Sequence, residues 1–185
     1  MKEIPDVVLE EAAGGSLAAF EEIYKSASGF VYSVALRVIQ DRADAEEVTQ
    51  DVFIKVYKHL SSFESRSSFK TWLYRITVNT ALNYTKKIQK ERLRRRNDER
   101  ILENQEVPAE AENRLDQEDK EKAVQVLLST LNPDQRACIV LREIEGLDYA
   151  QIASALGINL NTVRSRLKRA REALMAQARK GVMKK

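Results

Sequence analysis

Apolar residues along most of this chain recur every three or four positions, which is the period of an amphipathic α-helix. The clearest stripes are Leu17, Phe20, Tyr24, Ala27, Val31, Val34 and Val38, then Val48, Val52, Val56 and Leu60, and later Val163, Leu167, Ala170 and Leu174. The 185 residues include only three prolines and six glycines, which are too few turn-forming residues for the many short strands of a β-sandwich. We therefore predict an all-α protein.

Local signals predict where the helices of the first half begin and end. Residues 5–13 favour a short peripheral helix with a proline at its start. Ser16 is placed to cap the next helix, in which the pair Ser28-Gly29 predicts a break or kink between the two halves of a hairpin. Asp44 and Glu47 have the spacing of a capping box, in which each side chain satisfies a backbone N–H at the helix start. Together these signals predict a helical first domain.

The helix that follows Asp44 has a valine stripe that Phe53 and Tyr57 are expected to thicken. A further helix is expected from Ser67 or Ser68 to Tyr84, with Phe69 among its inward-facing residues. These two helices complete the predicted core of the first domain.

A linker is predicted at 91–121, because it is rich in acids from Asp98 onward, contains Pro108 and has little apolar material to bury. Helical periodicity resumes after it, and Asn132-Pro133 predicts a helix start. We see no repeat between the halves. The sequence therefore predicts two small helical domains, 1–90 and 122–180, joined by a flexible linker.

The strongest local pattern lies near the end of the second domain. Asp148 and Gln151 form a capping box, and Gly157 stands where a helix stop in the left-handed conformation is needed. Asn159 can cap a second helix after a tight turn. This arrangement predicts a helix-turn-helix.

Short hydrogen-bonding groups and cations gather on the second helix, opposite its apolar stripe, at positions that a DNA major groove could meet. They are Thr162, Arg164, Ser165, Lys168, Arg169 and Arg171. A basic solvated face on an ordinary helical bundle is the alternative. We favour DNA binding, because a tight turn, a small packing residue and charge on one side occur together.

Aromatic and basic residues alternate at the end of the first domain, in a pattern that can stack unpaired bases and hold phosphates. The set comprises Phe63, Lys70, Trp72, Tyr74 and Arg75, with the amides of Asn79 and Asn83 one or two turns further on. Alternatively, these aromatics complete a small core, and Asn79 braces the domain.

Several classes of chemistry find no support in the sequence. A single cysteine, Cys138, excludes an internal disulfide, and His59 is the only histidine, so we expect no metal site and no cofactor. No nucleophile with a base, paired carboxylates or phosphate-binding glycine loop is evident, so we expect no enzyme. Neither a membrane-length apolar run nor a signal pattern is present, which predicts a cytoplasmic protein without direct membrane insertion.

Five stretches of the sequence resemble one family. Leu131–Arg136, Leu141–Tyr149 and Thr162–Leu167 are similar to region 4 of the extracytoplasmic-function (group 4) sigma factors, which belong to the sigma-70 family. Ala45–Phe53 and Phe69–Asn79 are similar to region 2. The motifs occur in the family's order, and the match spans nearly all of the chain outside the linker. The resemblance implies a dissociable, promoter-specific initiation subunit of bacterial RNA polymerase.

For domain 1–90 the resemblance implies core-polymerase binding and recognition and melting of the minus-10 element. Gln50 and Asp51 match positions that contact the clamp helices of the largest polymerase subunit. Asn79 and the loop around Phe63 match the pocket for a flipped non-template base.

For domain 122–180 the resemblance implies that the helix from Asn161 to Arg171 holds the minus-35 duplex and that the domain contacts the polymerase flap. It also implies a stress or extracytoplasmic response under an anti-sigma factor. A dimeric helix-turn-helix regulator that acts without polymerase is the alternative; the aromatic and Asn-bearing helix of the first domain argues against it.

Overall fold

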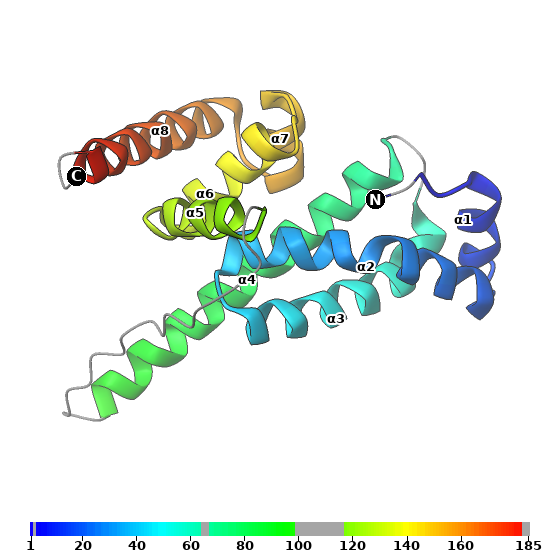
Figure 1. Cartoon of the computed structure of the whole chain (residues 1–185). Helices are drawn as coiled ribbons and strands as arrows, with labels where there is room; N and C mark the ends of the chain where they lie inside the picture. Colours follow the sequence, from blue (N-terminus) through cyan, green and yellow to red (C-terminus); the bar gives the residue numbers. More distant parts are fainter. Residues whose placement is uncertain (2, 64–66, 99–116, 183–185) are drawn as a thin grey trace.

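The computed structural model describes residues 1, 3–63, 67–98 and 117–182, and every regular element within these ranges is helical. The first group comprises α1 (Asp6–Ala13), α2 (Leu17–Ile39), α3 (Arg42–His59), the 3-10 turn η1 (Leu60–Ser62) and α4 (Phe69–Asp98). The second comprises α5 (Gln117–Ser129), α6 (Pro133–Ile139), the π-helical turn η2 (Val140–Ile144), α7 (Tyr149–Leu156) and α8 (Leu160–Val182). The predicted all-α class is confirmed (Figure 1).

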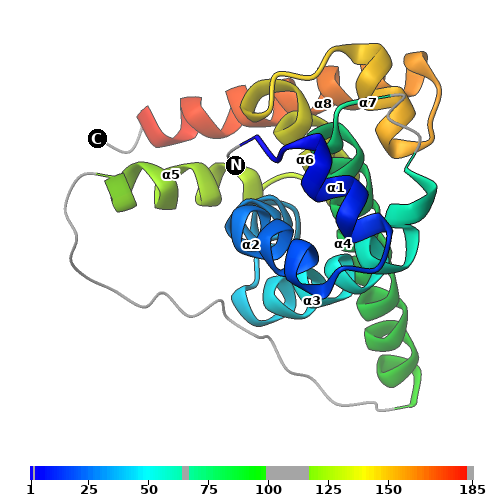
Figure 2. The ribbon, with the colours of Figure 1, turned by 90° about the vertical axis from the view of Figure 1, so that its right-hand side faces the viewer.

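Helices α2, α3 and α4 pack against one another, and α1 lies across one end of α2 (Figure 2). Val31, Val48, Val52 and Leu73 face inward as predicted and have no exposed surface. The predicted stripe of α2 is wrong at its start, because Leu17 and Tyr24 are 70% and 44% exposed and Ala19 and Ile23 are buried instead. Burying each such side chain contributes about 1.5–3 kcal/mol. These stripes therefore form the core on which the candidate site is built.

Helix α2 is continuous, so the predicted break at Ser28-Gly29 is wrong. Ala27 and Val31, on either side of the glycine, are both fully buried. One glycine within a helix costs about 1 kcal/mol relative to alanine, less than the burial of the stripe that continues past it contributes. Packing against α3 and α4 thus decides the conformation at Gly29.

The N-cap of α3 is Asp41, whose carboxylate accepts from the backbone N–H of Asp44 at 2.9 Å. The predicted cap at Asp44 is therefore wrong by one turn. Asp44 and Glu47 instead accept hydrogen bonds from the Tyr84 hydroxyl, at 2.8 Å and 3.0 Å. These two hydrogen bonds connect α4 to α3.

The helix-turn-helix prediction is confirmed in its geometry. Both halves of the Asp148–Gln151 capping box form, at 2.8 Å each. Gly157 is left-handed with φ of +63°, and the Asn159 side chain accepts from the N–H of Thr162 at 2.8 Å. A short α7, a tight turn and a long α8 follow from these local signals.

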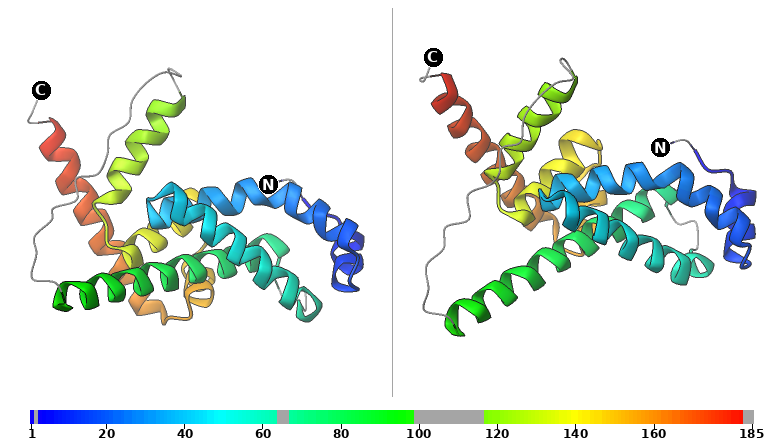
Figure 3. Two further views of the ribbon diagram at one scale, coloured as in Figure 1. Left: turned by 90° about the horizontal axis from the view of Figure 1, so that it is seen from below. Right: turned by 60° about the horizontal axis from the view of Figure 1, so that its bottom comes forward.

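Part of the predicted linker 91–121 is helical, because α4 continues to Asp98 and α5 begins at Gln117. The end of α4 projects away from the other helices (Figure 3). Residues 99–116 of the predicted linker lie outside the described ranges.

The two groups of helices pack together, α4 against α7 and α2 against α6. Arg136 of α6 is only 7% exposed and donates to three carbonyls: Val38 at 2.7 Å, Leu131 at 2.7 Å and Leu128 at 2.9 Å. Desolvation lowers its pKa, but an arginine remains charged at neutral pH. Because Val38 is in the last turn of α2, this cation joins the second group to the first.

Candidate nucleic-acid interface

The candidate DNA-reading surface of the second domain is the outer face of α8. Its inner stripe, Val163, Leu167 and Ala170, is fully buried, as predicted. The candidate residues lie on the other face: Asn161, Arg164, Ser165, Lys168 and Arg169 are exposed, and Thr162 and Arg171 are half-buried. The structure therefore brings all seven predicted residues onto one helix.

The cations of this face differ in how firmly other groups hold them. Lys168 and Glu172 are 4.0 Å apart and well exposed, a pair of little energetic weight. The Arg171 guanidinium donates to Glu143 at 2.7 Å, and this bond raises its pKa. The Arg164 guanidinium makes a long contact of 3.4 Å with the Asn161 side chain. Arg164 and Lys168 are thus available to meet a ligand, whereas Arg171 ties α8 to η2.

The predicted aromatic set of the first domain forms a cluster at the start of α4. The Phe63 ring lies 5.1 Å from Trp72 and 5.9 Å from Phe69, and Phe69 lies 5.7 Å from Trp72. Phe63 and Trp72 are half-buried. Each of the two aromatics therefore supports the core and still presents surface to solvent.

Tyr74 does not belong to this surface, because it is 1% exposed. Its ring packs edge-on against Phe30 at 4.6 Å, and the Lys70 ammonium lies 5.7 Å from the ring centre. The prediction that Tyr74 faces outward is wrong; the ring faces α2. Lys70 itself is exposed and remains a candidate cation.

Asn79 lies where the two domains meet. Its amide nitrogen donates to the backbone carbonyl of Ala155 in α7 at 2.9 Å, and the side chain is half-buried. Trp72 and Arg75 line a cavity of about 560 Å³ between α4 and α7. Asn83, one turn further along α4, is exposed.

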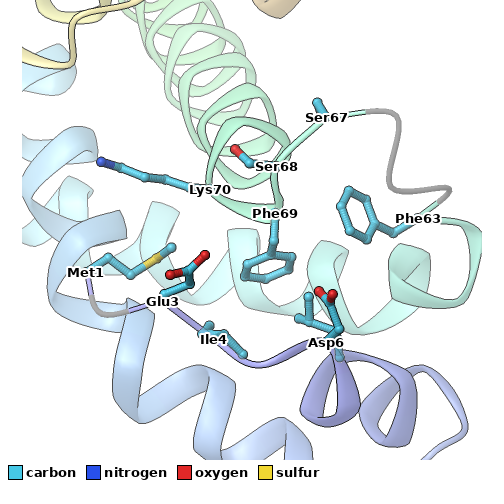
Figure 4. A pocket seen from close by; sticks show the side chains of 10 residues that line it. Met1, Glu3, Ile4, Asp6, Phe63, Ser67, Ser68, Phe69 and Lys70 are labelled. Carbon is cyan, nitrogen blue, oxygen red and sulfur yellow. The ribbon is translucent and has the colours of Figure 1, made fainter.

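A second cavity, of about 520 Å³, contains Phe63 (Figure 4). The start of α4 and the residues just before it form one wall, and the N-terminal residues with the first turns of α1 form the other. Asn79 is not among the lining residues, so the structure does not bring it together with Phe63 in one pocket.

The candidate polymerase-docking residues, Gln50 and Asp51, are exposed on α3 as predicted. Ile54 and Tyr57, one and two turns from Gln50, are 53% and 50% exposed. Tyr57 was expected in the core, but its ring makes only a T-shaped contact with Phe20, with 5.0 Å between the ring centres. These two side chains add exposed apolar surface on the same side of α3 as Gln50, which the sequence periodicity missed.

In the part of the chain that the structure describes, the side chains give little support to metal binding or thiol chemistry. No cluster there of three or more histidine, cysteine or acidic side chains could hold a metal ion. Cys138 is fully buried, and desolvation raises the pKa of its thiol to about 11. Within the same ranges, every helix is too short or too polar to span a bilayer.

Two small helical domains, the second a helix-turn-helix with a cationic outer face, define a nucleic-acid-binding protein. Comparison with known families agrees with this class. Residues 23–91 match "Sigma-70 region 2", and residues 121–174 match "Sigma-70, region 4".

Individual relatives extend the match over almost the whole chain. The ECF RNA polymerase sigma-E factor of Escherichia coli K12 is 35% identical over 176 residues, with 91% of each chain covered. The RNA polymerase sigma-H factor of Pseudomonas aeruginosa is 34% identical over 177 residues, with 90% of each covered. The chain spans only 61% of a third relative, the ECF RNA polymerase sigma factor SigE of Mycolicibacterium smegmatis, at 34% identity. The chain belongs to the extracytoplasmic-function sigma factors of the sigma-70 family.

One solved structure supports the same assignment, and a second shares the fold. The sigma factor RpoE of Bartonella quintana, in complex with the anti-sigma factor NepR, is 26% identical with a TM-score of 0.63, covering 86% of this chain and 96% of that one. CnrH, in complex with the cytosolic domain of CnrY, shares the fold at 22% identity and a TM-score of 0.63, covering 93% of this chain and 95% of that one.

Sequence reasoning missed two features of the site. The helix at residues 5–13 was expected to be peripheral, yet Leu9 is buried and, together with Ile4, lines the cavity beside Phe63. The apolar residues Ile4, Val8 and Leu9 were the available signal. The contact between Asn79 and Ala155 joins residues 76 positions apart, and no local pattern indicates it.

Proposed function

We propose that this chain directs RNA polymerase to promoters by binding two DNA elements with its two domains. The face of α8 from Asn161 to Arg171 holds the minus-35 duplex, and the start of α4 binds the unpaired minus-10 strand. The observation that carries this proposal is the occurrence of both sigma-70 regions, in order, with the exposed cations of α8 on the second. Bacterial RNA polymerase works in the cytoplasm, so we place the protein there, as a non-enzymatic initiation subunit.

In the minus-35 complex, Arg164 and Lys168 are the principal readers. Both are exposed near the start of α8, and helix-turn-helix proteins use this part of the recognition helix to reach base edges. A bidentate contact to a base edge contributes about 1–3 kcal/mol of discrimination. Arg169, Ser165 and Thr162 add contacts along the same face.

In the minus-10 complex, we propose that Phe63 and Trp72 stack on unpaired bases while Lys70 and Arg75 hold phosphates. Stacking of a base on an aromatic ring is worth about 1–3 kcal/mol. Asn79 and Asn83 supply amides for base edges. Because Asn79 donates to Ala155 in this arrangement, its use on DNA requires α7 to move away from α4.

For polymerase we propose docking through Gln50 and Asp51, with Ile54 and Tyr57 as the apolar part of the same surface. We propose that this face meets the clamp helices and that the second domain meets the flap, as the family resemblance implies. An anti-sigma factor is a further partner, because the similar sigma factor RpoE was solved in complex with the anti-sigma factor NepR.

Gel-shift and transcription assays with purified core polymerase test the proposal. The wild-type chain should bind promoter DNA tightly only together with core polymerase. Arg164→Ala and Lys168→Ala should each weaken promoter binding by about 1–3 kcal/mol. Arg179→Ala is the matched control, because Arg179 is an exposed cation near the end of α8, about two turns beyond the reading face.

Two results would contradict the proposal. Tight binding of duplex DNA by the chain alone would favour a free-standing regulator. Normal transcription by both Arg164→Ala and Lys168→Ala would exclude α8 as the reading helix. For docking, Gln50→Ala and Asp51→Ala should lower affinity for core polymerase without changing the melting temperature, since both side chains are exposed.

A further inference from the structure

Glu145 places a carboxylate in the contact between the two domains. It is the first residue after η2, and its side chain is only 10% exposed. Its ion-pair partner is Arg37 of α2, and 3.7 Å separates the guanidinium nitrogen from the carboxylate oxygen. The packing of α2 on α6 and η2, and of α4 on α7, is the closed arrangement of the two domains. The ion pair therefore exists only in the closed arrangement.

The cations that face this carboxylate all belong to the first domain. They are Arg37 of α2, Lys70 at the start of α4 and the amino group of Met1. The charged neighbours of Glu145 in η2 are engaged elsewhere. Arg142 donates to the Leu147 carbonyl at 2.8 Å. Glu143 accepts from Arg171 at 2.7 Å. Separation of the domains thus takes Glu145 away from all three cations.

The effect of burial on Glu145 is larger than the effect of these cations. A charge-assisted N–H···O bond is about 2.7–2.9 Å long, so the 3.7 Å contact with Arg37 does not replace the water that a buried carboxylate loses. Desolvation consequently raises the pKa of Glu145, and the three cations offset only part of that rise. The ionised carboxylate therefore costs free energy in the closed arrangement, as in many buried ion pairs.

The opening of the domains should change this pKa. Once α2 and η2 separate, we expect Glu145 to regain water and its pKa to return toward the usual value of 4.5. A group with a higher pKa in one state binds a proton more readily in that state, so acid favours that state. Acid should therefore favour the closed arrangement. The effect is absent well above the raised pKa, grows as the pH falls through it and is complete below 4.5.

The closed arrangement also restricts the candidate minus-10 surface. Asn79 donates to the Ala155 carbonyl of α7, and Trp72 and Arg75 line a cavity whose other wall is α7. We propose that Glu145 couples the packing of the two domains to pH, so that acid conditions favour the closed arrangement and withdraw Asn79 from DNA. The part of this inference that concerns DNA rests on the proposed reading of the minus-10 strand.

Energy transfer between dyes on α3 and α8 of the full chain measures the ratio of closed to open molecules. The Arg136→Lys background is used beside the wild type, because its weaker bond to Val38 should raise the open fraction. In that background the closed-to-open ratio should rise severalfold between about pH 7 and about pH 5. Glu145→Gln carries no titrating charge at this position, so it should raise the ratio at about pH 7 and remove most of the pH dependence.

Affinity for an unpaired minus-10 oligonucleotide gives a second measure, which works even when open molecules are few. Apparent affinity scales with the fraction of molecules that are competent to bind. Glu145→Gln should therefore bind the oligonucleotide severalfold more weakly than the wild type at about pH 7, and the two affinities should converge at about pH 5.

Glu143→Gln is the matched control, because Glu143 lies in the same turn but is half exposed and pairs with Arg171 within the second domain. It should leave the closed-to-open ratio and its pH dependence unchanged. Every variant retains His59, the only histidine, so a difference between variants assigns the pH response to Glu145. A thermal melt at both pH values confirms that each variant is folded.

Three outcomes would overturn the inference. If Glu145→Gln keeps the pH dependence of its background, another group senses the proton. If it lowers the closed-to-open ratio at neutral pH, the ion pair with Arg37 stabilises the closed arrangement instead. An equal effect of Glu143→Gln would assign the response to overall charge.

The proposed function can fail separately. Energy transfer that responds to pH and to Glu145→Gln as expected, with no binding of the minus-10 oligonucleotide by any variant, would confirm proton-linked closing. The same result would refute the proposed reading of the minus-10 strand by α4.

Discussion

Replacing Arg136 by methionine should destabilise the protein strongly and separate its two domains. The substitution keeps an unbranched apolar stem but removes all three hydrogen bonds to Val38, Leu128 and Leu131. A hydrogen bond to a charged group contributes about 1.5–3 kcal/mol. The contributions of the three bonds do not add, because water and small backbone shifts can satisfy some of the carbonyls that the substitution leaves unpaired.

A net loss of about 3–5 kcal/mol is the expected size, as for other buried charged networks that lose one member. That is a large fraction of the stability of a typical domain, about 5–15 kcal/mol. Arg136→Lys should lie between wild type and Arg136→Met, since one ammonium cannot reproduce the geometry of a guanidinium that donates in three directions.

Urea unfolding followed by circular dichroism measures the first effect, and energy transfer between dyes on α3 and α8 measures domain separation. Arg142→Met is the control: Arg142 donates one bond, to Leu147 at 2.8 Å, and lies 5.2 Å from the Tyr149 ring, entirely within the second domain. It should cost about 1–2 kcal/mol and leave the domains together. The reasoning is refuted if Arg136→Met is no more destabilising than Arg142→Met.

Two further predictions concern single side chains. Tyr84→Phe should lower stability at pH 7 by about 1–2 kcal/mol in urea unfolding, because it removes both bonds from α4 to the carboxylates of α3. Burial, with these two bonds, raises the pKa of Tyr84 above its usual value of 10.0, so wild-type stability is intact below pH 10 and declines as the pH rises further. Tyr84→Phe should lack that part of the decline. Identical slopes of unfolding free energy against pH in the two proteins would contradict this prediction. Because Cys138 is buried and burial raises its thiol pKa to about 11, a thiol reagent at pH 8 should modify it far more slowly in the native protein than in urea, and equal rates would show that the core opens there.

The elements that were predicted correctly depend on interactions between residues that are close together in the sequence. The caps at Asn132, Asp148 and Asn159, and the left-handed stop at Gly157, each involve residues within a few positions of one another. Helical stripes are equally local, since their period follows from backbone geometry. This is why the sequence alone predicts the helix-turn-helix and the exposed cationic face of α8.

The errors occur where the competing partner is distant in the sequence or where two local signals are equal. Asp41 and Asp44 are both suitable caps, and packing of Tyr84 on Asp44 favours the earlier one. Leu73 and Tyr74 are both buried, although the helical period placed only Leu73 inward; the partner of Tyr74, Phe30 of α2, is 44 positions away in the sequence.

Arg136 is a further case in which the partner of a side chain is too distant in the sequence to be predicted from it. In the sequence it is one basic residue among 31, and its partner Val38 is 98 positions away. Nothing local distinguishes it from a solvated arginine. Only the packing of α6 on α2 turns it into a buried cation that joins the domains.

The contact between Asn79 and Ala155 links the fold to the proposed mechanism. The Asn79 side chain is half-buried against α7 and donates to the Ala155 carbonyl there, so we expect minus-10 reading by Asn79 to require the two domains to separate. Separation also breaks the bond from Arg136 to Val38 and the 3.7 Å ion pair between Arg37 and Glu145. A ligand shifts such an equilibrium only by its differential affinity for the open state. We expect core polymerase to supply that difference by binding the two domains at separate sites, which is consistent with the proposed dependence of promoter binding on polymerase.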